Sequence, residues 1–190
     1  MWSEIWQGVV LSAPLLTGLL AHGLFMKLRL FPELAIPIDR GVSLRGKRLF
    51  GDNKTYRGIV AMALGTGCGY LLLGQFVRSG EHEHLSLLPA GPMALLLGLA
   101  VGAVAMAAEL PNSALKRQLD LPPGEQMKGL PRLAFHVIDQ VDIWMGAWLV
   151  LAFVVRPTLG LLLGSFFFVY RGHQVFTAIG YRLGMRATRY

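Results

Sequence analysis

Five apolar stretches, separated by short polar segments, make up most of the chain. They cover roughly residues 5–30, 59–77, 90–109, 138–155 and 158–179. A helix needs about 20 apolar residues to cross the ~30 Å hydrocarbon core of a bilayer, and these stretches come close to that length. The pattern predicts an all-α, polytopic membrane protein with about five transmembrane helices, in which residues 1–190 form a single domain.

Two prolines affect the interpretation of the first and last spans. Pro14 lies within the first span, where a helix bundle tolerates a kink. Only Arg156 and Pro157 interrupt the apolar sequence between the last two spans. Two separate helices are therefore expected, and a single broken helix is the alternative.

Nearly all basic residues lie on one side of this arrangement. Of the 18 Lys and Arg residues, all but Arg78 and Arg156 fall between spans one and two, between spans three and four, or near the C-terminal end. The positive-inside rule places that side in the cytoplasm. We therefore expect a multi-pass protein of the cell (inner) membrane, with its N-terminus outside and its C-terminus in the cytoplasm.

Composition narrows the class of protein further. Hydrophobic residues make up 54% of the chain and charged residues 15%, whereas soluble domains carry about 25% charged residues. The basic residues that give the chain its net charge of +7 flank the apolar spans. This position favours lipid headgroups and phosphorylated ligands over nucleic acid as partners. Gly65 and Gly69, and likewise Gly98 and Gly102, have small-xxx-small spacing, which indicates close helix packing; a homo-oligomer face is the alternative.

A glycine-rich basic segment, Gly41 to Gly58, lies between the first two spans. Glycine lets backbone N–H groups approach a ligand closely, and Lys and Arg side chains bind phosphate oxygens. The segment lacks the glycine and lysine spacing of a P-loop. Its predicted phosphate-binding residues are Arg45, Lys47, Arg48, Lys54 and Arg57.

Three acidic residues are expected near the cytoplasmic ends of the spans. Asp139 and Asp142 are three residues apart, so they share one face of a helix. Paired carboxylates are hard oxygen ligands that suit Mg²⁺, and Glu109 ends the third span at a depth where it could join them. The alternative is that the two aspartates form interfacial ion pairs with Lys128 or Arg132.

The segment after Glu109 supplies a second candidate phosphate site. Pro111 is expected to end the third span, and Asn112 or Ser113 to cap a short helix that follows. Lys116 and Arg117 would then face a phosphate held near that cap. The alternative is that they only anchor the protein at the membrane surface.

Three motifs in order, Pro37 to Gly58, Glu109 to Gly124 and Asp139 to Asp142, resemble the CDP-archaeol synthase family, whose members are membrane CTP:lipid-phosphate cytidylyltransferases related to bacterial CDP-diacylglycerol synthases. Those bacterial enzymes carry an S-x-x-K-R element followed by G-G-x-x-D-R-x-D. Ser113, Lys116 and Arg117 match the first element, and Asp139 and Asp142 match the acids of the second. His136-Val137 replaces the paired glycines and Gln140 the arginine, which places the chain nearer the archaeal branch.

The resemblance implies a reaction in which CTP and a lipid phosphate give a CDP-lipid and pyrophosphate. The lipid is an archaetidic-acid-like ether lipid or a phosphatidate. It also implies catalytic roles for Asp139, Asp142, Lys116 and Arg117, with Mg²⁺ held by the aspartates and Glu109. The basic segment, with Asn112 and Ser113, would bind substrate phosphates, and which basic cluster serves which substrate stays open.

Two other functions fit a small apolar protein. A transporter or lipid flippase would relay protons through acids near mid-membrane, but here the acids are expected at the cytoplasmic ends of the spans. A transferase that consumes a CDP-lipid would carry a D-G-x-x-A-R motif and further spaced aspartates, which this chain lacks.

Overall fold

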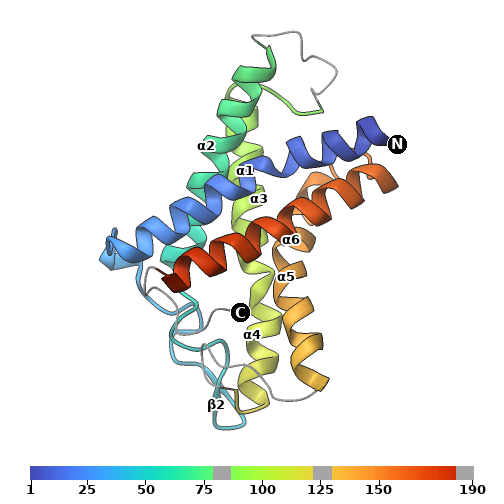
Figure 1. The fold of residues 1–190 in the computed structure, drawn as a ribbon. Helices are drawn as coiled ribbons and strands as arrows, with labels where there is room; N and C mark the ends of the chain where they lie inside the picture. The colour runs from blue at the N-terminus through green and yellow to red at the C-terminus, as the bar shows by residue number, and fades with distance from the viewer. Residues whose placement is uncertain (79–86, 122–129, 183–190) are drawn as a thin grey trace.

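The computed structural model describes residues 1–78, 87–121 and 130–182, and helices dominate it (Figure 1). The helices are α1 (Trp2–Lys27), α2 (Tyr56–Arg78), α3 (Pro92–Ala107), α4 (Glu109–Gln118), α5 (Leu130–Leu151) and α6 (Leu159–Arg182). A 3₁₀ turn, η1 (Pro32–Leu34), and a two-stranded hairpin, β1 (Ser43–Leu44) and β2 (Lys47–Arg48), lie between α1 and α2. The predicted all-α fold is confirmed.

Among the described residues, three helical segments are long and apolar enough to cross a membrane: α1, α2 up to Val77, and the nearly continuous rod Pro92–Gln118 formed by α3 and α4. The apolar part of α5, Val141–Leu151, is shorter. Large apolar side chains on the outer faces are exposed, such as Leu72 at 66% and Leu149 at 63%, as expected for surfaces that meet lipid rather than water. The chain is therefore a multi-pass membrane protein, and the count of five crossings stays a prediction.

When α3 and α4 are taken as one rod, successive helices alternate in direction, and α1 and α6 run side by side in the same direction (Figure 1). Gly8 near the start of α1 packs against Leu161 near the start of α6, and Leu16 packs against Gly172 further along both helices. Parallel helices begin on the same side of a bundle. This arrangement agrees with the order expected for five alternating spans.

The third span does not end where the sequence predicts. α4 begins at Glu109, one residue after α3, and Pro111 lies in its first turn, where a missing N–H breaks no helical hydrogen bond. The residue at the cap is Ala108, with helical dihedrals and no side-chain cap. The prediction that Pro111 ends the span and that Asn112 or Ser113 caps the next helix is therefore wrong, because proline in a first turn lets the helical path continue.

The last two spans form separate helices. α5 begins at Leu130, before its expected start near residue 138, so Asp139 and Asp142 lie well inside it. α5 ends at Leu151, and α6 begins at Leu159. The hydroxyl of Thr158, the residue before α6, accepts a hydrogen bond from the N–H of Leu161. The alternative of a single broken helix is wrong.

The close contact between α2 and α3 gives a test of the packing. A Cβ atom at Gly98 would lie 2.7 Å from Cα of Gly67 and 2.8 Å from the carbonyl oxygen of Thr66, both backbone atoms that cannot swing aside. We expect Gly98→Ala to lower the free energy of unfolding in detergent by about 1–3 kcal/mol, the usual cost of overpacking. Gly74→Ala is the matched control in α2, because its Cβ would meet only ordinary contacts at 3.6 Å. Equal stabilities of the two variants in thermal denaturation would contradict this packing.

Candidate active site

The basic segment forms a closed loop at one end of the bundle. We call residues 37–55 the basic loop. Its ends meet in an antiparallel bridge between Pro37 and Thr55, and the N–H of Ile38 donates to the carbonyl of Lys54 at 2.8 Å. Between them the β1–β2 hairpin carries Arg45 at its exposed turn. Closure of the loop fixes where its glycines and cations lie.

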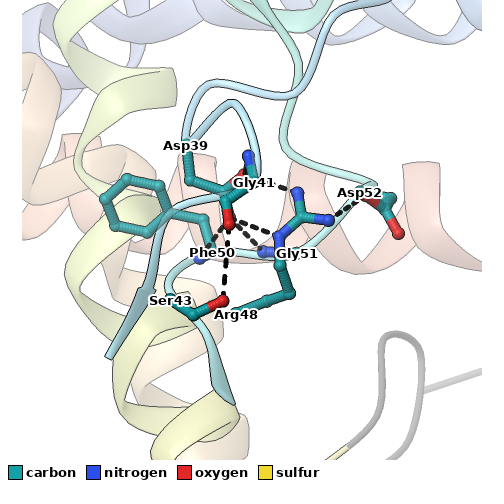
Figure 2. A network of polar contacts seen from close by, with 7 residues as sticks. All are labelled: Asp39, Gly41, Ser43, Arg48, Phe50, Gly51 and Asp52. Atoms are coloured by element: carbon teal, nitrogen blue, oxygen red, sulfur yellow. Dashed lines mark hydrogen bonds and ion pairs between the residues drawn. The ribbon is translucent and has the colours of Figure 1, made fainter. Parts of the chain in front are cut away.

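Asp39 stands at the centre of the basic loop with a fully buried side chain (Figure 2). Its carboxylate accepts hydrogen bonds from the backbone N–H groups of Gly41 at 3.1 Å, Phe50 at 2.9 Å and Gly51 at 3.1 Å. It also pairs with the guanidinium of Arg48 at 2.5 Å. Sequence reasoning did not select Asp39; the available signal was an Asp two residues before a Gly, a pattern typical of side-chain-stabilised turns.

The surroundings of Asp39 keep it ionised. Burial alone would raise the pKa of this carboxyl, but the hydrogen bonds from Arg48 and from the three backbone N–H groups outweigh burial and lower the pKa well below its usual range. The same contact with Asp39 raises the pKa of Arg48, which also pairs with Asp52 at 2.7 Å. Arg48, a predicted phosphate-binding residue, is therefore engaged by two carboxylates inside the loop.

Three residues of the basic loop hold it against the α3–α4 rod and the residues that follow it. Lys47 Nζ donates to the carbonyl of Gln118 at 2.9 Å and pairs with Asp120 at 2.6 Å. A Cβ atom at Gly51, whose φ is +91°, would lie 3.6 Å from the Arg117 side chain. Lys54 forms a largely buried ion pair with Glu109. The loop and α4 thus form one wall.

The other wall is α5, joined to α4 through Asn112. The Asn112 amide nitrogen donates to Asp139 at 2.6 Å and to Asp142 at 2.9 Å, and Lys116 forms an ion pair with Asp139. Asp139 and Asp142 share one helix face, as their spacing predicts. Of the alternative partners, Lys128 and the side chain of Arg132 lie outside the described residues.

Several buried polar atoms in this region have no hydrogen-bond partner within the described residues. Three of them are donors: Nε of Arg57, Nε of Arg117 and Nε2 of Gln118. The fourth, Oδ1 of Asn112, is an acceptor. A buried polar atom without a hydrogen bond lowers the stability of the fold by about 1–3 kcal/mol, so such atoms indicate where a ligand would bind. Unpaired guanidinium N–H groups suit phosphate oxygens, and an unpaired amide oxygen suits a cation or a donor group.

Glu109, Asp139 and Asp142 lie in one charged region but have different partners. Glu109 pairs with Lys54, and it interacts electrostatically with His22 of α1 and His173 of α6. Sequence reasoning assigned neither histidine to the site, because an isolated His in an apolar helix is usually a packing residue. Within the described ranges no three His, Cys, Asp or Glu side chains converge as a metal cluster.

The donor set nevertheless fits a magnesium ion. Mg²⁺ is usually bound through one or two carboxylates, with substrate phosphates and water completing its octahedral shell. Asp139 and Asp142 supply two carboxylates on one face, and the Asn112 amide nitrogen donates a hydrogen bond to each of them. The aspartates therefore fit the predicted site, and two of the three acids are paired with a lysine: Asp139 with Lys116 and Glu109 with Lys54.

The structure brings together most of the predicted site residues. The contacting residues on the facing elements are Lys54, Glu109, Asn112, Lys116, Asp139 and Asp142. Ser113 is buried next to Asn112 in α4, Arg57 lies in the first turn of α2, and Arg117 lies beside Gly51. Arg45 is exposed at the hairpin turn, and Lys47 and Arg48 are engaged within the loop or with the end of α4.

A family profile and several proteins of known function are similar to this chain. The sequence profile of the CarS-like CDP-archaeol synthase family matches residues 33–190. The CDP-archaeol synthase of Halobacterium salinarum is 37% identical over 127 residues, which cover 65% of this chain and 63% of that protein. That of Methanosarcina barkeri is 28% identical over 165 residues, covering 79% and 87% of the two chains. No solved structure gives a significant match.

The extent of these matches differs among relatives. The CDP-archaeol synthase of Pyrococcus furiosus is 38% identical over 103 residues, covering 53% of this chain and 56% of that protein. The chain thus spans less than two thirds of the Halobacterium and Pyrococcus proteins. The profile match begins in η1 and includes the whole basic loop, α4 and the aspartate pair.

The lowered pKa of Asp39 predicts how the basic loop responds to acid. A depressed pKa stabilises the folded loop above the unfolded value of about 3.9, and this stabilisation is lost only as pH falls through the lower folded value. We expect hydrogen exchange at the amides of Phe50 and Gly51, corrected for intrinsic rates, to stay slow from neutral pH down to about pH 4. Loss of their protection between about pH 6 and pH 5 would contradict this assignment.

Proposed function

The chain belongs to the CDP-archaeol synthase family, and we propose that it transfers the cytidylyl group of CTP to a membrane lipid phosphate, giving a CDP-lipid and pyrophosphate. The observation that carries the proposal is the contact of α4 with α5. There the lysine of the S-x-x-K-R element and the preceding Asn112 meet both acids of the D-x-x-D element. Two motifs separated in sequence therefore make one polar centre.

The reaction needs little covalent chemistry from the protein. An oxygen of the lipid phosphate attacks the α-phosphorus of CTP and forms a new phosphoanhydride bond. The bond from the α-phosphorus to the oxygen that bridges to the β-phosphorus breaks, and that oxygen leaves with pyrophosphate. A phosphate monoester is already an anion near pH 7, since its second pKa is about 6, so no general base is required.

The main task of the site is to hold two anionic substrates together. Lys116 and Arg117 on α4 would bind one phosphate group, and Lys54 at the end of the basic loop and Arg57 at the start of α2 would bind the other. The buried N–H groups of Arg57 and Arg117 without partners support these roles. Positioned cations stabilise the charge that spreads over the phosphoryl oxygens in the transition state.

Asp139 and Asp142 would hold the magnesium ion. When bound, Mg²⁺ neutralises phosphate charge and polarises the phosphoryl group for in-line displacement. The two aspartates are themselves oriented by Asn112, and Asp139 also by Lys116. A place for Glu109 in the metal shell would require it to leave Lys54.

The setting of the site follows from the same proposal. The basic loop and α4 lie on the cytoplasmic face of the cell membrane, where CTP is found, with the N-terminus outside and the C-terminus inside. Membership of the CDP-archaeol synthase family favours an ether-linked lipid phosphate over phosphatidate as the substrate. A transporter or flippase is not favoured, because the acids cluster at one end of the bundle and contact cations rather than spanning the membrane interior.

An assay with the purified full chain in detergent tests the function. Labelled CTP is supplied with Mg²⁺ and either an ether-linked isoprenoid glycerol phosphate or phosphatidate. We expect a labelled CDP-lipid with the ether lipid and none when CMP replaces CTP. No CDP-lipid from either lipid would exclude the proposed activity, and equal rates with both would exclude selectivity for the ether lipid.

The aspartate pair gives the sharpest prediction for the mechanism. Asp139→Asn and Asp142→Asn should each lower kcat by about 1,000-fold or more, because each removes an anionic ligand of the proposed metal. Glu33→Gln is the charge-matched control, since Glu33 is exposed in η1, outside the basic loop and the helices that form the site. Wild-type turnover in both site variants would remove the metal-binding role, provided that their thermal unfolding matches the wild type.

A further inference from the structure

We propose that Asp39 is a positioning residue for CTP: it holds the basic loop in the conformation that presents its cations to the nucleotide's phosphates. This inference rests on the proposed cytidylyl transfer. Asp39 does not touch the substrates in this proposal. It acts through the loop that it organises.

The first argument is the number of contacts that converge on one buried carboxylate. Both oxygens of Asp39 are used, with Gly41 and Arg48 on Oδ1 and with Phe50 and Gly51 on Oδ2 (Figure 2). These partners come from both sides of the hairpin. One side chain therefore ties the start of the basic loop to its end.

The second argument is what the tied segment reaches. Gly51, whose N–H is bound to Asp39, lies against the side chain of Arg117. Three residues later Lys54 meets Glu109, and the N–H of Lys54 donates to the carbonyl of Gly51 at 3.3 Å. Asp39 thus sets the distance between the loop's cations and those of α4.

The third argument concerns which substrate the basic loop meets. Residues 41–46 are exposed, and the loop lies beside the outer end of α4 rather than among the apolar helices (Figure 1). A nucleotide arrives from water, whereas a lipid phosphate stays at the bilayer surface. The position of the loop therefore favours the triphosphate of CTP as its ligand.

The sign of the effect separates positioning from simple electrostatics. Replacing an aspartate with asparagine removes a negative charge close to a site for an anion, which by Coulomb's law alone would tighten CTP binding. Positioning predicts the opposite, because an asparagine amide cannot accept hydrogen bonds at both of its ends. Asp39→Asn should therefore weaken CTP binding despite the more favourable charge.

The experiment measures kcat and KM for CTP, with the lipid phosphate that the wild type accepts held at saturation. We expect Asp39→Asn to raise KM for CTP by about tenfold or more, the scale of one lost charge-assisted hydrogen bond, with kcat within about threefold of the wild type. Asp52→Asn is the matched control, because it removes the same charge from the same guanidinium but is 80% exposed. Its KM should be unchanged or lower.

A second variant perturbs the basic loop without changing its charge. Gly41 has a φ of +88°, and a Cβ there would meet no atom within 4 Å, so Gly41→Ala strains only the backbone that binds Asp39. We expect a rise in KM for CTP of about threefold, in the same direction as Asp39→Asn. This variant keeps the test decisive if Asp39→Asn does not fold.

The outcomes separate this inference from the proposed function. An unchanged or lower KM for CTP in Asp39→Asn and Gly41→Ala, with an active wild type, would overturn the positioning role and leave cytidylyl transfer intact. A fall in kcat alone would also overturn it. A wild-type protein that does not use CTP would overturn both.

Discussion

The bridge that Asn112 makes to two aspartates is the interaction on which the polar end of this bundle depends. Asp139 and Asp142 lie on one face of α5 at the point where its apolar stretch begins, and two carboxylates there would repel each other and pay a desolvation cost. Donors from α4 offset both costs. Because those donors lie on a helix continuous with α3, the same contact fixes where the α3–α4 rod meets α5.

The cations around this centre differ in whether they already have partners. The side chains of Lys47, Arg48, Lys54 and Lys116 are each paired with a carboxylate. Arg57 and Arg117 each retain a buried N–H group without a partner in the described structure. A net basic charge is therefore a poor guide to ligand contacts, whereas unpaired buried donors show where an anion would recover lost hydrogen bonds.

Much of this organisation could be predicted from the sequence, for reasons specific to each feature. Apolar stretches of membrane-spanning length predicted the helices, and the three-residue spacing predicted that Asp139 and Asp142 share a face. The prediction that Pro111 ends the third span was wrong, because the effect of a proline depends on whether it lies within the first turn of a helix or after the last turn. The role of Asp39 could not be predicted with confidence from its neighbours, since three of its four partners are 9 to 12 residues away along the chain.

The depth of the site follows from helix lengths rather than from loop residues. Lys116 lies on the last turns of the rod Pro92–Gln118, and Asp142 lies at the start of the apolar stretch Val141–Leu151. Lys116 contacts Asp139 and Asp142 contacts Asn112, so this polar centre lies where apolar helix surface gives way to charged surface. A lipid phosphate occupies that same boundary in a bilayer, and a nucleotide reaches it from water. In the proposed reaction, this arrangement would let a water-soluble nucleotide and a membrane lipid meet without either one leaving its own phase.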